Sequence, residues 1–200
     1  MRKLLVLGLV LMATGAAAQT DPNPNGIGFY FDEGGVYNCL PSAAPYTLIN
    51  AYLLATRITQ SAGISGWEAG IAIMPTPAFP PTYTLPGIIL NPPTPPNFQV
   101  GLGSALPYEP AIKLLTVSIL NFGTPFALAV GPCTPSSFGG LCPGYADGAD
   151  PDLLIGLTPS TGIPVPGQPY FYTVASFMYI CGDDLAAEDD SWSGVKRLYQ

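Results

Sequence analysis

The chain has 200 residues, with six basic and thirteen acidic side chains and a formal net charge of −7. This charge argues against a nucleic-acid partner, and the absence of histidine excludes Ser-His-Asp and Cys-His catalysis and His-ligated metal sites. The 23 glycines and 24 prolines accompany a hydrophobic fraction of 48%, which indicates short strands joined by many turns rather than disorder.

The first eighteen residues have the pattern of a secretory signal peptide. Met1–Lys3 is basic, Leu4–Met12 is apolar, and Ala13–Ala18 is small. The apolar run is too short to span a membrane, and no later stretch is long enough; an uncleaved anchor is the alternative. We expect a secreted protein (extracellular, at the cell surface or periplasmic) with one domain over 19–182 and an acidic linker and tail over 183–200.

The first half of that domain reads as strands. Short strands are expected at 27–31 and 36–40. Tyr46–Met74 then predicts a long apolar strand, a glycine turn and a second apolar strand, which together would form a hairpin. Trp67 follows the turn and is expected to anchor the core.

Residues 75–110 carry eleven prolines. Because proline lacks an amide donor, we expect only edge strands here, at 83–85, 88–90 and 98–102. A polyproline ligand for a partner domain is the less favoured interpretation.

In the second half of the domain, apolar and polar residues alternate clearly. Residues 111–122 predict a half-buried strand that forms a hairpin with 126–130. A long loop is expected over 133–151, with strands at 153–157 and 170–181. The sum is an all-β fold, an antiparallel β-sandwich of about nine strands, whose immunoglobulin-like or jelly-roll order stays open.

Four cysteines in an exported chain favour disulfides. Three pairings exist, and we favour Cys133–Cys142 and Cys39–Cys181. A zinc site built from all four cysteines is disfavoured because no C-x-x-C spacing occurs.

A catalytic role would have to come from carboxylates. Asp32, Glu33, Glu68 and Glu109 are candidates for a glycoside hydrolase. Glu68 follows Trp67, so burial would raise its pKa. The favoured interpretation is instead an ion pair between Glu68 and Arg57 across the predicted hairpin, and no enzyme activity.

The one cofactor hypothesis is calcium. Asp147, Asp150 and Asp152 lie within six residues and would supply oxygen ligands, although a solvated acidic loop is the favoured interpretation. Tyr83, Tyr108 and Tyr145 are candidates for stacking on sugar rings, against ordinary surface packing.

Several motifs resemble a group of exported bacterial β-sandwich proteins that carry no assigned activity. These motifs are G-I-G-F-Y-F-D-E at 26–33, G-I-S-G-W-E at 63–68, F-Q-V-G-L at 98–102, Y-A-D-G at 145–148, L-I-G-L-T-P-S-T-G at 154–162 and S-W-S-G-V-K-R-L-Y at 191–199. The resemblance implies a recognition or sorting role for tail residues Trp192, Lys196, Leu198 and Tyr199. A short terminal helix docked on the domain is the alternative.

The sequence therefore predicts a non-catalytic binding or structural module whose partner is a surface polymer or a protein. The alternative is a calcium-assisted carbohydrate-binding or adhesion domain, and a glycoside hydrolase comes third. No membrane span is expected in the mature chain.

Overall fold

The described part of the chain consists of strands, turns and loops. A computed structural model describes residues 23–90, 94–137, 139–160, 163–168 and 170–178, and no helix occurs in these ranges. The predicted all-β class is therefore confirmed, and within these ranges no helix is long and apolar enough to cross a membrane. The predicted signal peptide and tail lie outside the described residues.

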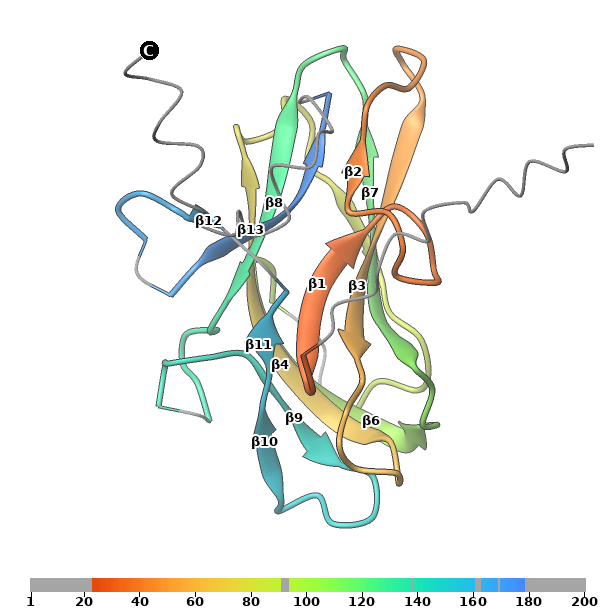
Figure 1. The fold of residues 1–200 in the computed structure, drawn as a ribbon, viewed down its shortest axis with the longest axis vertical. Coiled ribbons are helices and arrows are strands. Elements are labelled where there is room, and N and C mark those ends of the chain that lie inside the picture. Colours follow the sequence, from red (N-terminus) through yellow and green to blue (C-terminus); the bar gives the residue numbers. More distant parts are fainter. Residues whose placement is uncertain (1–22, 91–93, 138, 161–162, 169, 179–200) are drawn as a thin grey trace, which may run out of the picture.

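The strands form two mixed sheets (Figure 1). Sheet A contains β1 (Gly26–Tyr30), β3 (Leu48–Thr56), β5 (Thr82–Thr84), β7 (Ala111–Leu120) and β11 (Thr158–Pro159). Sheet B contains β2 (Cys39–Leu40), β4 (Ile64–Met74), β6 (Asn97–Leu106), β8 (Phe126–Gly131), β9 (Gly144–Asp147), β10 (Leu154–Gly156), β12 (Ile163–Pro164) and β13 (Tyr172–Phe177). The order in sheet A is β11-β1-β3-β7-β5. In sheet B it is β10-β9-β4-β8-β13-β12, with β2 beside β13 and β6 beside β4.

The described residues contain thirteen strands, where about nine were expected. The additional ones include β9, which lies inside the predicted 133–151 loop, and the two-residue strands β11 and β12. Two pairings are parallel, β1 with β11 and β2 with β13, so neither sheet is purely antiparallel. Segments of two to four residues are too short to show an alternating pattern, which is why the sequence did not reveal them.

Successive strands alternate between the sheets, and this overturns both predicted hairpins. The first eight strands belong to sheets A and B in turn, so β3 and β4 do not pair, and neither do β7 and β8. Each of these strands has an inward apolar face. Two such strands placed in opposite sheets bury those faces against one another across the core.

The turn between β3 and β4 depends on Gly63. Its φ is +86°, and a Cβ built there would lie 1.9 Å from the carbonyl oxygen of Leu106. Only glycine fits this conformation and this close backbone approach. The turn thus carries the chain from sheet A to sheet B without a side chain in the way.

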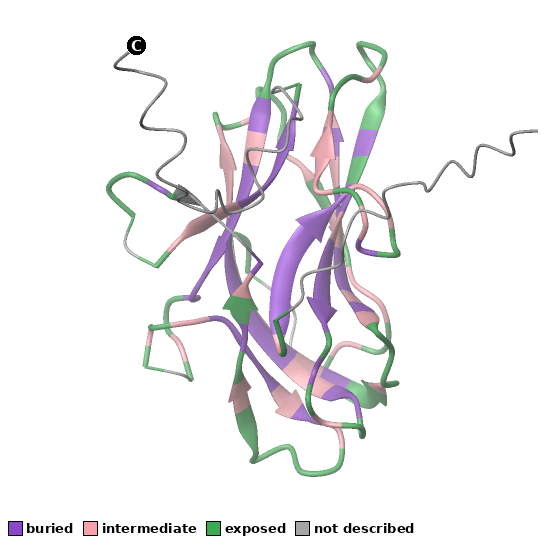
Figure 2. Ribbon diagram, viewed as in Figure 1, coloured by how far each residue is buried: buried purple, intermediate pink, exposed green. Residues whose placement is uncertain are grey.

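A single hydrophobic core joins the sheets. All five residues of β1 are buried, as Figure 2 shows, and Leu115, Val117 and Ile119 of β7 are buried as the alternating pattern predicted. Trp67 is 4% exposed and stacks on Phe98, with ring centroids 5.8 Å apart, which confirms it as a core anchor.

Candidate functional site

Phe122, in the turn that joins β7 to β8, contacts two other exposed aromatic rings. This turn lies at the upper end in Figure 1. Tyr46, Phe79 and Phe122 are 76%, 57% and 41% exposed, and we call them the aromatic surface. Phe79 stacks on Phe122 at 5.3 Å with an interplanar angle of 13°, and Tyr46 meets Phe122 edge-on at 5.9 Å. Large aromatic side chains exposed together in this way mark binding surfaces more often than scattered ones do.

The buried Asn121 holds the aromatic surface in place. Its side-chain amide donates to the carbonyl oxygens of Ala43 (3.2 Å) and Ala44 (2.9 Å), and its Oδ1 accepts from the Gly123 amide (2.7 Å). The amide of Tyr46 donates to the Asn121 carbonyl at 2.7 Å. Asn121 therefore links the loop of Tyr46 to the loop of Phe122, which preorganises these two rings, and Phe79 comes from a third segment that stacks on Phe122.

A cavity of about 200 Å³ adjoins Phe122. The residues lining it are Pro75, Thr76, Pro77, Ala78, Ile119, Leu120, Asn121, Phe122, Thr124, Pro125 and Phe126. None of them is charged. The aromatic surface and this cavity together offer an apolar, neutral site with a few amide and hydroxyl groups, a composition typical of ligand sites.

Sequence reasoning missed this surface, although a signal for it exists. Each ring lies beside a turn residue, as in Pro45-Tyr46, Phe79-Pro80 and Phe122-Gly123. An aromatic residue in a turn has no sheet face on which to be buried, so it is a better candidate for exposure than one within a strand.

A second pocket, of about 290 Å³, lies on the outer face of sheet B, and we call it the Glu68 pocket. Glu68 on β4 faces Gln99 on β6 and Gly144 on β9, and Gly66 faces Gly101 and Ala146 on the same two strands. The floor of the pocket therefore consists of three glycines and an alanine. The other residues that line the pocket are Trp67, Val100, Ser137, Tyr145 and Leu154.

Glu68 is 5% exposed, and its carboxylate binds a loop rather than Arg57. Its Oε1 accepts from the Ser136 hydroxyl at 2.6 Å, and the Ser137 amide donates to both carboxylate oxygens at 3.0 Å. Gln99 donates to Oε2 at 3.5 Å. The predicted partner, Arg57, lies just beyond β3, and because β3 and β4 belong to different sheets the expected cross-hairpin pair does not form.

The pKa of Glu68 also differs from the prediction. Burial raises it, but the hydrogen bonds from Ser136, Ser137 and Gln99 outweigh burial, and the pKa lies below its ordinary value of 4.5. Glu68 is therefore ionised at neutral pH. An ionised carboxylate is no general acid, and no second carboxylate lines this pocket.

The predicted Cys133–Cys142 disulfide is wrong for this structure, in which both residues are free thiols. Cys133 is buried and donates to the Pro135 carbonyl oxygen at 2.9 Å, so its side chain is already engaged within its own loop. Burial and the nearby charge of Glu68 raise the pKa of Cys133 to about 11 and also raise the pKa of Cys142. Both thiols are protonated at neutral pH and are therefore poor nucleophiles.

The predicted calcium loop does not assemble a ligand set. Oδ2 of Asp147 accepts from the amides of Ala149 (3.1 Å) and Asp150 (3.0 Å), and Oδ1 of Asp150 accepts from the Asp152 amide (3.2 Å). These carboxylates close turns within the loop. In the part of the chain that the structure describes, no three His, Cys, Asp or Glu side chains come close enough together to hold a metal ion.

The three tyrosines proposed to stack on sugars do not form one platform. Tyr145 is 1% exposed, and its hydroxyl donates to Oδ1 of Asn25. Tyr83 is half-buried and packs edge-on against Phe98, whereas Tyr108 is exposed. The exposed rings that contact one another are instead those of the aromatic surface, Tyr46, Phe79 and Phe122.

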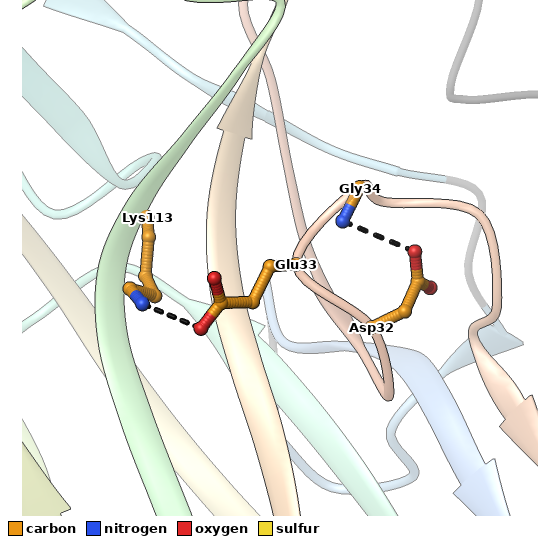
Figure 3. A network of polar contacts seen from close by, with 4 residues as sticks. All are labelled: Asp32, Glu33, Gly34 and Lys113. Carbon is orange, nitrogen blue, oxygen red and sulfur yellow. Dashed lines mark hydrogen bonds and ion pairs between the residues drawn. The ribbon is translucent and has the colours of Figure 1, made fainter.

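Two further carboxylates considered for hydrolysis have structural roles (Figure 3). Asp32 accepts from the amides of Gly34, Val36 and Tyr37, which closes the turn after β1. Glu33 forms an ion pair with Lys113 at 2.6 Å. The remaining candidate, Glu109, is exposed.

We expect the Lys113–Glu33 ion pair to contribute little to stability. Both side chains are more than a third exposed, and such pairs contribute about 1 kcal/mol or less. Lys113→Met should therefore change the free energy of unfolding, measured in urea, by less than ~1 kcal/mol. A larger loss would show that the contact of Lys113 with the Tyr52 ring, 5.7 Å from its centroid, matters more than exposure suggests.

Two predicted features extend beyond the described residues. Cys39 lies beside Ser176 in the β2–β13 pair, but its predicted partner, Cys181, falls outside, so that pairing stays a prediction. The tail residues Trp192, Lys196, Leu198 and Tyr199 also fall outside.

Comparisons with protein families, with curated proteins and with solved structures find no match for this chain.

Proposed function

We propose that this protein is a secreted, non-catalytic binding module with a β-sandwich fold, acting at the cell surface or in the external matrix. The observation that carries the proposal is the aromatic surface, in which Phe122 contacts both Tyr46 and Phe79 beside a neutral cavity. The sandwich is supported by two sheets that share one core. Secretion is supported by the pattern of residues 1–18.

The proposed ligand is a neutral polysaccharide. Sugar rings present flat C–H faces that pack on aromatic rings, and their hydroxyls suit the threonine hydroxyls and backbone groups of the adjoining cavity. No charged residue lines that cavity, and the net charge of −7 would repel an acidic polymer. Calcium is not part of the proposal, because Asp147, Asp150 and Asp152 assemble no metal site.

A non-catalytic role is supported by the state of the candidate catalytic groups. The buried carboxylate Glu68 is ionised, and it has no carboxylate partner among the residues that line its pocket. The described thiols, Cys133 and Cys142, have raised pKa values. Neither the acid–base pair of a glycosidase nor an activated nucleophile is built from these residues.

Sedimentation with insoluble polysaccharides tests the proposal. The oxidised mature protein is mixed with cellulose, chitin or starch granules, and the bound fraction is measured. We expect binding to at least one of them, weakened about tenfold or more by Phe122→Ala, because removing the central ring separates Tyr46 from Phe79.

The matched control is Tyr37→Ala, which removes an exposed ring outside the aromatic surface and should leave binding unchanged. Absence of wild-type binding to all three polymers, or equal binding by Phe122→Ala, contradicts the proposal. Concentration-dependent dimerisation that Phe122→Ala abolishes would instead assign the surface to self-association.

A further inference from the structure

Within the described ranges, no ion pair reaches the carboxylate of Glu68. The interactions that lower its pKa are all hydrogen bonds from neutral groups. The neighbouring thiols Cys133 and Cys142 are uncharged at neutral pH because their pKa values are raised. Among the described residues, the ion pair that forms joins Lys113 to Glu33 instead. Buried carboxylates are normally paired with a cation, so this arrangement is unusual.

The carboxylate also keeps acceptor capacity. Oε1 accepts from the Ser136 hydroxyl at 2.6 Å and the Ser137 amide at 3.0 Å, and the Ser137 side chain also bonds to the carboxylate. Oε2 accepts from the same Ser137 amide at 3.0 Å and from Gln99 at 3.5 Å. Gln99 directs its amide more closely to the Pro135 carbonyl oxygen, at 2.9 Å. Each oxygen of an ionised carboxylate has two lone pairs, so a charged donor could replace the long Gln99 contact at Oε2.

The pocket beside this carboxylate is preformed. It exists because Gly66, Gly101, Gly144 and Ala146 leave no bulk on the strands that flank Glu68. Residues on adjacent strands at one register position share a face of the sheet, so these small residues lie on the same outer face as Glu68. Leu154 adds an apolar wall.

We propose that the Glu68 pocket binds an organic cation, a primary ammonium or guanidinium group carried on a short alkyl stem. The cation would donate to Oε2 of Glu68, and the stem would pack against Leu154 over the small-residue floor. A lysine or arginine side chain of a partner protein and a free alkyl amine share this chemistry. The proposal does not depend on polysaccharide binding, which uses a different part of the molecule.

Nuclear magnetic resonance titration of the full mature chain tests this site. The probes are n-butylguanidinium and n-butylammonium, with 1-pentanol as the neutral comparison. We expect the two cations to shift the amide signals of Ser137, Gly144 and Gln99, and 1-pentanol to bind at least tenfold more weakly.

Two variants probe the charge and the space separately. Glu68→Gln removes the charge at nearly constant shape, and Ala146→Leu fills the floor while leaving the charge in place. Each should weaken cation binding at least tenfold. Glu109→Gln removes an exposed carboxylate and should have no effect.

The proposal is overturned if neither cation shifts these signals at high millimolar concentration, or if 1-pentanol binds as tightly as the cations. It is also overturned if Glu68→Gln binds them like the wild type. If Glu68→Gln does not fold, Ala146→Leu tests the proposal instead. Unchanged cation binding by Ala146→Leu would show that the cation binds elsewhere, which overturns the proposal. In every case Glu68→Gln, if folded, should keep its binding to polysaccharide, which separates this proposal from the proposed function.

Discussion

Replacing Trp67 by alanine is expected to lower the free energy of unfolding by about 3–5 kcal/mol, a large share of the stability of an ordinary domain. Trp67 is 4% exposed and stacks on Phe98, a fully buried residue of the neighbouring strand β6. Its removal takes away apolar contact area and leaves a cavity that the rigid strands β4 and β6 cannot close. Urea unfolding followed by far-ultraviolet circular dichroism measures the change.

Trp67→Phe is the matched variant, because it retains a ring that can stack on Phe98. It should lose no more than about half as much stability as Trp67→Ala. A loss below ~1 kcal/mol for Trp67→Ala would contradict the assignment of Trp67 to the core, since exposed positions usually change stability by about 0.5 kcal/mol or less.

The strands themselves were largely readable from the sequence, because a half-buried strand alternates. Residues 111–120 alternate clearly and form β7, and 26–30 form β1. The alternation says which side of a strand faces the core but not in which sheet the strand lies. A strand in sheet A and one in sheet B both turn an apolar face inward, so the pattern of β7 and β8 is the same for a hairpin as for strands in opposite sheets.

The hydrogen-bond partners of Glu68 could not be predicted from the residues near it in the sequence. Gln99, Ser136 and Ser137 lie 31, 68 and 69 residues away from it in the chain. Their meeting depends on β6 pairing with one edge of β4 and on the loop after β8 returning along the other edge. Proximity in sequence favoured Arg57 as the partner of Glu68. The chain crosses from sheet A to sheet B between these two residues, so the predicted ion pair across a hairpin does not form.

Glu68→Gln is expected to lower the free energy of unfolding by about 1–3 kcal/mol at pH 7, because it weakens hydrogen bonds made to a buried charge. The loss should depend on pH. The folded-state pKa of Glu68 lies below 4.5, so the carboxylate stabilises the folded protein fully above its unfolded pKa. That contribution disappears as the pH falls through the lowered, folded-state pKa.

Urea unfolding of the wild type and Glu68→Gln at pH 7, 5 and 3 measures this difference. It should be largest at pH 7 and should shrink on acidification, as the pH falls through the lowered folded-state pKa of Glu68 and its carboxyl group takes up a proton. Glu109→Gln, which alters an exposed carboxylate, should show a small difference at every pH. A difference for Glu68→Gln that grows on acidification would mean that burial, rather than the hydrogen bonds of Ser136 and Ser137, dominates the pKa of Glu68. Glu68 would then have a raised pKa and hold a proton more readily. A neutral carboxyl group would not attract a cation, so this result would also argue against the proposed cation site.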